Sequence, residues 1–168
     1  MQFRCFKQVD SSNSVGEQRV LLTMATSTGK TFVAFQICWK LWSSRWNRAR
    51  EHRRPRILYL ADRNILIDDP MAKTFAPFGD ARWKIAGGNA ILSREMYFAT
   101  YQSIAADVNR PGLFREFPAD FFDAIVIDEC HRGSSREDGN WREILNYFST
   151  ASQIGMTATP RRQDNADT

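Results

Sequence analysis

The chain has few of the residues on which disulfide frameworks and histidine-rich metal sites depend. Among its 168 residues are only 3 cysteines and 2 histidines. The spacing of Cys5, Cys38 and Cys130 matches neither a disulfide framework nor a zinc site. His52 and His131 are too few for a histidine-rich metal site. The sequence therefore excludes a disulfide-stapled scaffold and a zinc-binding module.

The chain also lacks long hydrophobic runs. No apolar stretch approaches the roughly 20 residues that span a membrane. Residues 1–8 are too polar to form the hydrophobic region of a signal peptide, so a cytoplasmic location is expected. The hydrophobic fraction of 43% and charged fraction of 25% are typical of a globular protein. The length suits one domain with its own core.

Positive charge is in modest excess, with a net charge of +4 and a sequence pI near 9.2. It gathers in one stretch that is relieved by a single acidic residue, Glu51. The arginines of this stretch are Arg45, Arg48, Arg50, Arg53, Arg54 and Arg56. One interpretation is a solvated helix end and loop, because cations are favoured near a helix C-terminus. The other is a contact with nucleic acid.

Strand-like and helix-like segments alternate along the chain, which predicts an α/β fold with a mostly parallel sheet and helices on both faces. The expected strands are 20–24, 56–61, 83–85, 96–99, 123–128 and 153–156. The expected helices are 30–50, a short helix capped by Asp62 that runs through 65–67, a helix entered over 100–104, and 140–148. The segment 70–88 is expected to be a loop around its short strand.

The first expected strand leads into Met24-Ala25-Thr26-Ser27-Thr28-Gly29-Lys30-Thr31. A glycine turn before a helix can cradle phosphates with backbone N–H groups. Lys30 would reach the β- and γ-phosphates of ATP, and the Thr31 hydroxyl would bind Mg²⁺. The strict phosphate-loop pattern is broken because Met24 replaces its first glycine. The residues expected to bind the nucleotide are Thr26, Ser27, Thr28, Gly29, Lys30 and Thr31.

A second apolar strand ends in two adjacent carboxylates, Asp128 and Glu129. We expect Asp128 to hold Mg²⁺ and Glu129 to orient and deprotonate the attacking water. Two solvated acids at a strand end are the simpler alternative. Together with the phosphate loop, the pair predicts nucleoside-triphosphate hydrolysis, with Asp128, Glu129 and Lys30 as catalytic residues. This requires Lys30 and Asp128 to converge across neighbouring strand ends.

Three further residues could couple hydrolysis to movement. His131 follows the acidic pair, and Thr157 and Thr159 place small hydroxyls at the end of the last strand. Such hydroxyls can hydrogen-bond to a carboxylate or an imidazole, although turn chemistry explains them equally well.

In this order, the strings MATSTGKT, LADRN, ATYQS, DECH and GMTATP resemble the first motor domain of superfamily 2 helicases and translocases. Leu60–Asn64 and Asp128–Gly133 resemble, more narrowly, the restriction subunit of type I restriction-modification enzymes. The resemblance implies a RecA-like P-loop NTPase fold over 18–160 and ATP-driven movement on double-stranded DNA. It also implies modification and specificity subunits as partners.

The resemblance also implies DNA-binding residues that composition does not reveal. Arg63 and the stretch Thr100, Tyr101 and Gln102 fall where relatives touch the DNA backbone. That contact is independent of base sequence.

The chain departs from the family pattern in three places. Ser27 stands where relatives usually have glycine, so strain at that position is expected to weaken ATP binding. Residues 1–17 form a poorly defined segment in which Gln8 could be read as a remnant of the adenine-reading motif, at a short spacing. The chain stops soon after Pro160, so 161–168 is expected to fray and the second motor domain to be absent.

Two other functions remain open on these residues. One is a degenerate remnant that binds nucleotide or DNA without turnover, which Ser27 and the missing second domain favour. The other is a different superfamily 2 role, such as repair or RNA unwinding. An isolated lobe is expected to hydrolyse ATP weakly, because the partner lobe supplies arginines to the hydrolytic site.

Overall fold

The computed structural model describes residues 19–25, 28–86, 90–105, 112–128 and 135–158, with the backbone alone for 135–140. Its strands are β1 (Arg19–Thr23), β2 (Ile57–Ala61), β3 (Arg82–Lys84), β4 (Met96–Thr100), β5 (Ala124–Asp128) and β6 (Ser152–Thr157). Its helices are α1 (Lys30–Ser43), α2 (Ile65–Ala72), α3 (Tyr101–Ile104) and α4 (Ser135–Tyr147). Two 3₁₀ segments, η1 (Ala76–Ala81) and η2 (Leu113–Glu116), complete the described elements.

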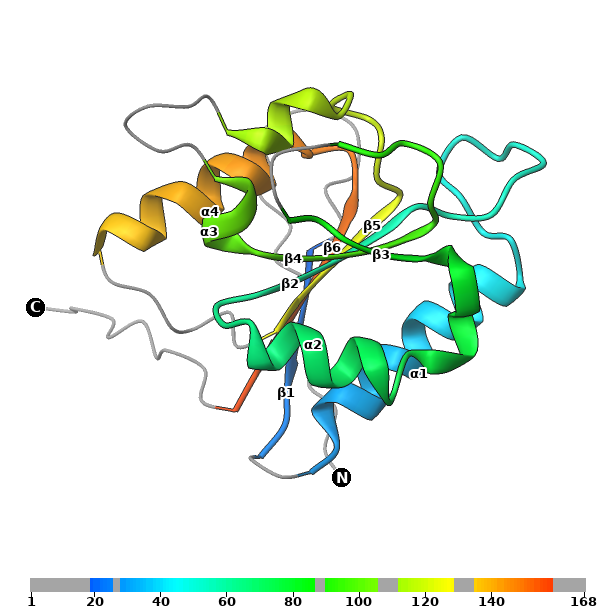
Figure 1. The fold of residues 1–168 in the computed structure, drawn as a ribbon, viewed down its shortest axis with the longest axis horizontal. Coiled ribbons are helices and arrows are strands. Elements are labelled where there is room, and N and C mark those ends of the chain that lie inside the picture. The colour runs from blue at the N-terminus through cyan, green and yellow to red at the C-terminus, as the bar shows by residue number, and fades with distance from the viewer. Residues whose placement is uncertain (1–18, 26–27, 87–89, 106–111, 129–134, 159–168) are drawn as a thin grey trace, which may run out of the picture.

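The six strands form a single sheet in the order β1-β6-β5-β2-β4-β3, and every neighbouring pair is parallel. Helices α1 and α2 cover one face, and α3, α4 and η2 cover the other (Figure 1). The predicted α/β fold is therefore confirmed. Parallel strands need helical crossovers, and these place a helical layer on each face of the sheet.

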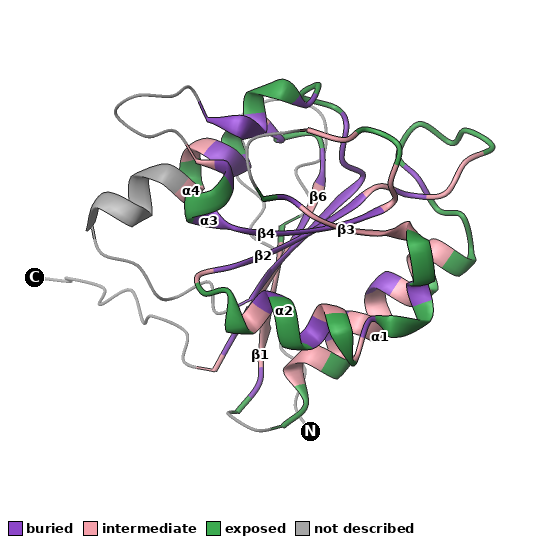
Figure 2. Cartoon of the chain, viewed as in Figure 1, coloured by how far each residue is buried: buried purple, intermediate pink, exposed green. Residues whose placement is uncertain are grey.

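Three central strands of the sheet are buried from solvent along their whole length. All five residues of β2, β4 and β5 are buried (Figure 2). Strands covered on both faces read as continuous apolar runs, which is why these segments could be recognised in the sequence. Their side chains divide between two clusters, one beneath α1 and α2 and the other beneath α3 and α4.

Helix α1 ends at Ser43, so the prediction that it reaches Arg50 was wrong. Arg45 adopts a left-handed conformation with φ 55°, and its N–H donates to the Trp42 carbonyl at 3.2 Å. The N–H of Trp46 donates to the Leu41 carbonyl at 3.0 Å. These two bonds form a Schellman motif, which closes a helix. This position normally favours glycine, and because arginine occupies it here, the end of the helix could not be recognised from the sequence.

The region after β2 also differs from expectation. Helix α2 begins at Ile65 with Asn64, not Asp62, at its N-cap, and no side chain caps it there. It continues through Pro70 to Ala72, where a loop had been predicted. Pro70 is buried, and its carbonyl accepts a hydrogen bond from the Phe75 N–H at 2.8 Å. The helix thus accommodates a buried proline, although proline removes one backbone hydrogen bond.

Cys38 of α1 is a free, fully buried thiol in the cluster beneath α1. Burial raises its pKa to about 12, so the group stays protonated and unreactive. Within the described ranges, no helix is long and apolar enough to cross a membrane.

Candidate active site at the carboxyl edge of the sheet

The candidate site lies where the parallel strands end. In open α/β sheets, ligands bind outside the carboxyl ends of the strands. Here β1, β6 and β5 end side by side, with Thr23 opposite Thr157 and Asp128 opposite Met156. The N–H of Met24, just beyond β1, donates to the Thr157 carbonyl at 2.9 Å. The expected phosphate loop and the acidic strand therefore open onto the same edge.

Strand β1, which leads toward Lys30, and strand β5, which ends at Asp128, are not neighbours, and this corrects one expectation. Strand β6 lies between β1 and β5. The last strand of the chain inserts into the middle of this half of the sheet, and a local sequence pattern cannot reveal such an insertion. As a result, Thr157 occupies the central strand end between the other two.

The loop after β1 enters α1 through a left-handed glycine. Gly29 lies at the N-cap of α1 with φ 80° and ψ 32°, a left-handed conformation that costs a residue with a side chain about 1 kcal/mol. No side chain caps the helix at this position. The Thr28 hydroxyl donates to the Ala25 carbonyl at 2.6 Å and tightens the turn.

Lys30 and Thr31 are the first two residues of α1, and both are partly exposed. Helix N-terminal N–H groups and a lysine at the same place suit a polyphosphate. Thr26 and Ser27 lie outside the described residues, so the expected strain at Ser27 stays a prediction.

Asp128 is the last residue of β5 and is only 4% exposed. Its Oδ2 accepts a hydrogen bond from the Tyr59 hydroxyl at 2.8 Å. Tyr59 is fully buried in the middle of β2. Burial, and then the nearby Asp128 charge, raise the pKa of Tyr59 well above its usual range, so the phenol stays neutral and donates.

Tyr59 is a residue that the motifs did not identify. Its strand partner is Val126, two residues before Asp128, so the Tyr59 and Asp128 side chains leave the sheet on the same face. The available signal was a hydroxyl-bearing residue in an otherwise aliphatic buried strand, because a buried tyrosine needs a hydrogen-bond partner.

The donor set fits one magnesium ion bound together with a nucleotide. Mg²⁺ usually takes one or two carboxylates and completes its shell with phosphate oxygens and water. Asp128 offers a buried carboxylate, and Thr31 offers a hydroxyl at the start of α1. Among the described residues, no group of three or more acidic, histidine or cysteine side chains could hold a metal by itself.

The predicted coupling residues are only partly visible. Thr157 is 1% exposed and ends β6 beside the strands of the phosphate loop and Asp128. Glu129, His131 and Thr159 lie outside the described residues, and so do Gln8 and 161–168. Their predicted roles remain predictions.

The four predicted DNA-binding residues lie at the ends of two adjacent strands, β2 and β4, whose last residues Ala61 and Thr100 are paired. Arg63 is 67% exposed, with its Nε 3.6 Å from the Asp62 carboxylate. Thr100 and Tyr101 are buried, whereas Gln102 is exposed.

Thr100 and Tyr101 both contribute to the fold. The Thr100 hydroxyl accepts a hydrogen bond from the Ser103 N–H at 3.3 Å and caps α3. Tyr101 packs in the core cluster beneath α3 and α4. Arg63 and Gln102 are thus the members of this set that present side chains to solvent.

Comparison with known proteins agrees with this geometry. A family model described as type III restriction enzyme, res subunit, matches residues 1–162. The chain is 49% identical over 95% of its length to the type I restriction enzyme EcoAI endonuclease subunit of Escherichia coli. It is 29% identical over 92% of its length to the EcoKI endonuclease subunit of Escherichia coli strain K12. It spans only 19% and 14% of these two proteins.

Solved structures show the same similarity. A fragment assigned as the HsdR subunit of a type I restriction enzyme from Vibrio vulnificus matches 90% of this chain and 24% of its own, with 59% identity and a TM-score of 0.69. The UvsW helicase of bacteriophage T4 matches 88% of this chain and 49% of its own, with 18% identity and a TM-score of 0.59, which shows the fold alone. The resemblance inferred from the ordered motifs is confirmed, and the chain belongs to the restriction-enzyme family whose model spans residues 1–162.

Proposed function

We propose that this chain is the ATP-binding lobe of a type I restriction translocase, in which ATP hydrolysis drives movement on double-stranded DNA. One observation carries the proposal: the left-handed turn at Gly29 opens α1 on the same sheet edge as the buried carboxylate of Asp128. The type I relatives favour this narrower assignment over the type III description of the family model.

Each residue at the edge has a distinct role in the proposed reaction. The N–H groups at the start of α1 and the Lys30 ammonium hold the phosphates of ATP. The hydroxyl of Thr31 and the carboxylate of Asp128 hold Mg²⁺, which when bound neutralises the charge that develops on the transferred phosphoryl group. Glu129 orients the attacking water and takes its proton.

Coupling to DNA is proposed to run along the same edge. Thr157 lies between the two halves of the nucleotide site, so a change at the phosphates can reach β6 directly. His131 and Thr159 would complete this link. Arg63 and Gln102 would touch the DNA backbone, with Thr100 and Tyr101 setting the shape of that strand end.

The proposed partners are duplex DNA, a second motor lobe, and the modification and specificity subunits of a restriction complex. The curated relatives are several times longer than this chain, which spans 19% of the EcoAI subunit. A complete site is proposed to need arginines from the second lobe, as in other nucleotide-hydrolysing motors.

Titration calorimetry with a non-hydrolysable ATP analogue tests the nucleotide site in the chain itself. Wild type is expected to bind in the presence of Mg²⁺, Lys30→Ala to lose most of the affinity, and Asp128→Asn to lose the Mg²⁺ dependence. Arg142→Ala, an exposed change on α4, serves as the control. Equal affinity in all four proteins would refute the assignment.

A second measurement tests turnover. In a chain extended to the length of the relatives, duplex DNA is expected to stimulate ATP hydrolysis, and Glu129→Gln is expected to abolish it while sparing binding. Nucleotide binding without any hydrolysis in the extended protein would favour the degenerate remnant instead. Stimulation by RNA in place of DNA would favour another superfamily 2 role.

A further inference from the structure

The structure divides the arginine-rich stretch into two groups with different surroundings. Arg53, Arg54 and Arg56 are partly buried and have partners within the protein. The Arg54 guanidinium lies 3.5 Å from the Trp42 ring centroid, and that of Arg56 lies 4.4 Å from the Phe121 ring centroid. These cations serve the fold.

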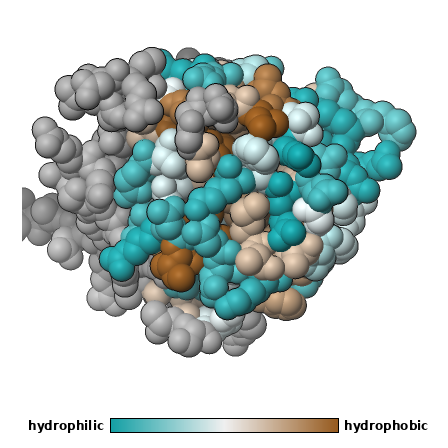
Figure 3. Space-filling model, viewed as in Figure 1, coloured by the Kyte–Doolittle hydropathy of each residue, from teal (hydrophilic) through white to brown (hydrophobic). Residues whose placement is uncertain are grey.

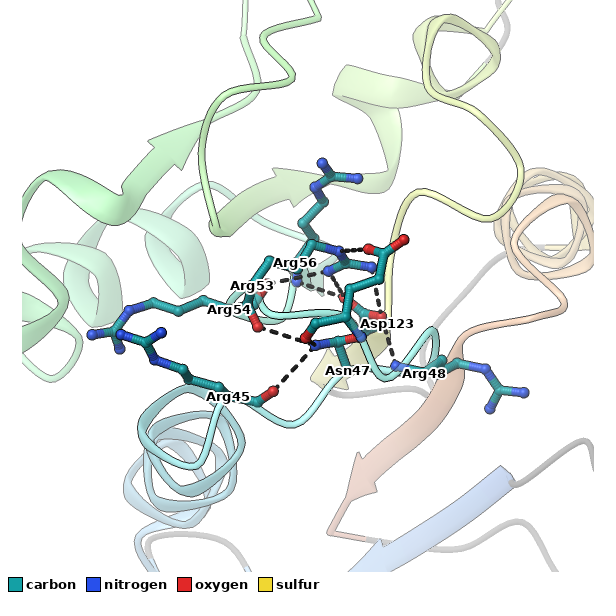
Figure 4. A network of polar contacts seen from close by, with 8 residues as sticks. Arg45, Asn47, Arg48, Arg53, Arg54, Arg56 and Asp123 are labelled. Carbon is teal, nitrogen blue, oxygen red and sulfur yellow. Dashed lines mark hydrogen bonds and ion pairs between the residues drawn. The ribbon is translucent and has the colours of Figure 1, made fainter.

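Asp123 pairs with Arg53 of this first group and accepts hydrogen bonds from backbone N–H groups on either side of Arg53 in the sequence (Figure 4). Its carboxylate is 2% exposed and accepts hydrogen bonds from the backbone N–H groups of Arg48 and Arg56, both at 2.9 Å. Arg53 donates to it through Nη1 at 2.6 Å and Nη2 at 3.2 Å. These bonds tie the loop between α1 and β2 to the start of β5.

The second group, Arg45, Arg48 and Arg50, is exposed. Arg45 and Arg48 project away from Asp123 in Figure 4. The segment that carries the three side chains, Arg45–Arg50, is called here the arginine loop, and it lies in the hydrophilic projection at the right of Figure 3. The only side-chain partner found in the described part of the chain is Ser152, whose Oγ accepts a hydrogen bond from Arg48 Nη1 at 3.4 Å.

The arginine loop is held rigidly from within. Asn47 is 5% exposed, and its Nδ2 donates to the carbonyls of Arg45, Glu51 and Arg53 at 3.2, 2.8 and 3.0 Å. Its Oδ1 accepts from the Glu51 N–H at 2.8 Å. The backbone that carries the guanidinium groups is therefore fixed before binding. This lowers the conformational entropy that is lost when the loop binds an anion.

Arg45 and Arg50 also stand in unfavourable backbone conformations. Their φ angles are 55° and 54°, in the left-handed region that glycine adopts without strain. The fold would be served better by glycine at both positions. Because these two exposed arginines occupy strained backbone positions, their side chains are candidates for a function.

We propose that the arginine loop binds the phosphate backbone of duplex nucleic acid, as a contact separate from the carboxyl edge of the sheet. The loop precedes β2, whereas Arg63 follows it, so the two contacts lie at opposite ends of a strand about 16 Å long. The charge of the loop is of one sign, because the nearby Glu51 is paired with Arg53 at 2.6 Å.

A protein partner fits this surface less well. The core of a protein interface is more apolar than the rest of the surface, and the arginines enriched there accompany several aromatic side chains. Trp46, 38% exposed, is the one large hydrophobic side chain exposed in the arginine loop. Asn47, which could otherwise read a base edge, is fully engaged by the backbone. The expected contact is therefore independent of base sequence.

The test measures polarisation of a labelled duplex of about 20 base pairs over a range of salt concentrations. Arg45→Gly/Arg50→Gly is expected to weaken binding about 5- to 50-fold at 0.1 M salt and to lower the salt slope by about 2. Its Tm is expected to stay level or rise, because glycine relieves the strained backbone. If the two arginines merely supported the fold, replacing them with glycine would lower the Tm.

Three further variants are compared with the double glycine variant in the same assay. Arg45→Lys/Arg50→Lys keeps the charge and is expected to retain most of the affinity. Lys73→Ala/Arg142→Ala removes two exposed cations elsewhere and is expected to bind like wild type. Arg63→Ala reports on the carboxyl edge alone, so its effect is expected to add to that of the arginine loop.

Two outcomes would overturn the proposal. One is that the double glycine variant binds duplex as tightly, and with the same salt slope, as Lys73→Ala/Arg142→Ala. The other is that polyglutamate at equal charge concentration competes as well as duplex, which would point to an acidic protein. Neither outcome depends on nucleotide binding, so the proposal can fail while the proposed function stands.

Discussion

The two edges of the sheet each carry a buried aspartate, and the two are held in different ways. At the amino edge, the carboxylate of Asp123 accepts four hydrogen bonds, two from the Arg53 guanidinium and two from backbone N–H groups. At the carboxyl edge, Asp128 accepts a hydrogen bond from the neutral hydroxyl of Tyr59. Both are at most 4% exposed.

The difference separates a structural carboxylate from a candidate functional one. A cation and two main-chain donors neutralise Asp123 and leave it no role beyond joining the loop to β5. A neutral phenol orients Asp128 and adds no positive charge of its own, and a carboxylate is a ligand type that a magnesium ion prefers. The predictions below test this contrast, from the largest expected effect to the smallest.

Asp123→Ala should be the most destabilising of these changes. It leaves the partly buried Arg53 and two backbone N–H groups without their acceptor, and breaking a buried pair costs about 3–5 kcal/mol. Urea unfolding followed by circular dichroism measures the loss. A cost below about 1 kcal/mol would show that the amino edge does not depend on this carboxylate.

The pKa of Cys38 predicts a loss of stability in alkaline solution. Its folded pKa of about 12 exceeds the ordinary value of 9.0, so the folded state holds the thiol proton more tightly. The contribution is complete below pH 9 and is lost as the pH rises toward 12, by about 1.4 kcal/mol per unit.

Cys38→Ala should flatten this part of the pH profile. The comparison is made in a Cys5→Ser/Cys130→Ser background, so that Cys38 is the single thiol. In that background the thiol should also resist an aromatic disulfide reagent at pH 8 until the chain unfolds. Rapid modification of the folded protein would contradict the burial of Cys38.

Tyr59→Phe should weaken the Mg²⁺-dependent binding of an ATP analogue about 10-fold, because it removes the hydroxyl that orients Asp128. Binding without Mg²⁺ should hardly change. Titration calorimetry at several Mg²⁺ concentrations separates the two effects. Equal weakening with and without the metal would mean that the hydroxyl supports the fold and not the metal ligand.

Gly29→Ala should destabilise the chain by about 1 kcal/mol through backbone strain. Among the described residues, an added Cβ would meet the Phe32 Cβ alone, at 4.0 Å, which is an ordinary contact. Thermal unfolding measures the cost, and the same variant should bind the nucleotide analogue more weakly. Unchanged stability would show that the turn relaxes without its left-handed residue.

Glu143→Gln should have the smallest effect, below about 1 kcal/mol. Glu143 forms an ion pair with Arg115 at 2.5 Å, but both side chains are well exposed to solvent. It is the surface counterpart of the buried pair at Asp123 and should be measured by the same urea unfolding. A cost matching that of Asp123→Ala would remove burial as the reason for the difference.

The fold class could be predicted because it rests on local patterns. The apolar runs of β2, β4 and β5 are buried on both faces, and nothing but a parallel sheet covered by helices accommodates three such strands easily. The helix ends were harder. Arg45 ends α1 in a conformation that its side chain disfavours, and Pro70 continues α2 where a break is usual.

The candidate site could be predicted where one motif carries the chemistry, as at Gly29 and Asp128. Tyr59 could not be found in this way, because it lies 69 residues from Asp128 along the chain and meets it only through the pairing of β2 with β5. The division of the arginines could not be predicted either, since Arg53 pairs with Asp123, 70 residues away, and Arg56 lies over the ring of Phe121.

Short stretches of the chain are enough to specify which segments become buried strands, where a glycine permits a left-handed turn, and which acidic residues end a strand. These are consequences of side-chain size, polarity and backbone freedom within a few residues. Folding of the whole chain places β6 between β1 and β5, brings the Tyr59 hydroxyl to Asp128, and pairs Asp123 with the Arg53 guanidinium, while the side chains of the arginine loop stay exposed. Those outcomes depend on contacts between distant segments, which exist only once the sheet has formed.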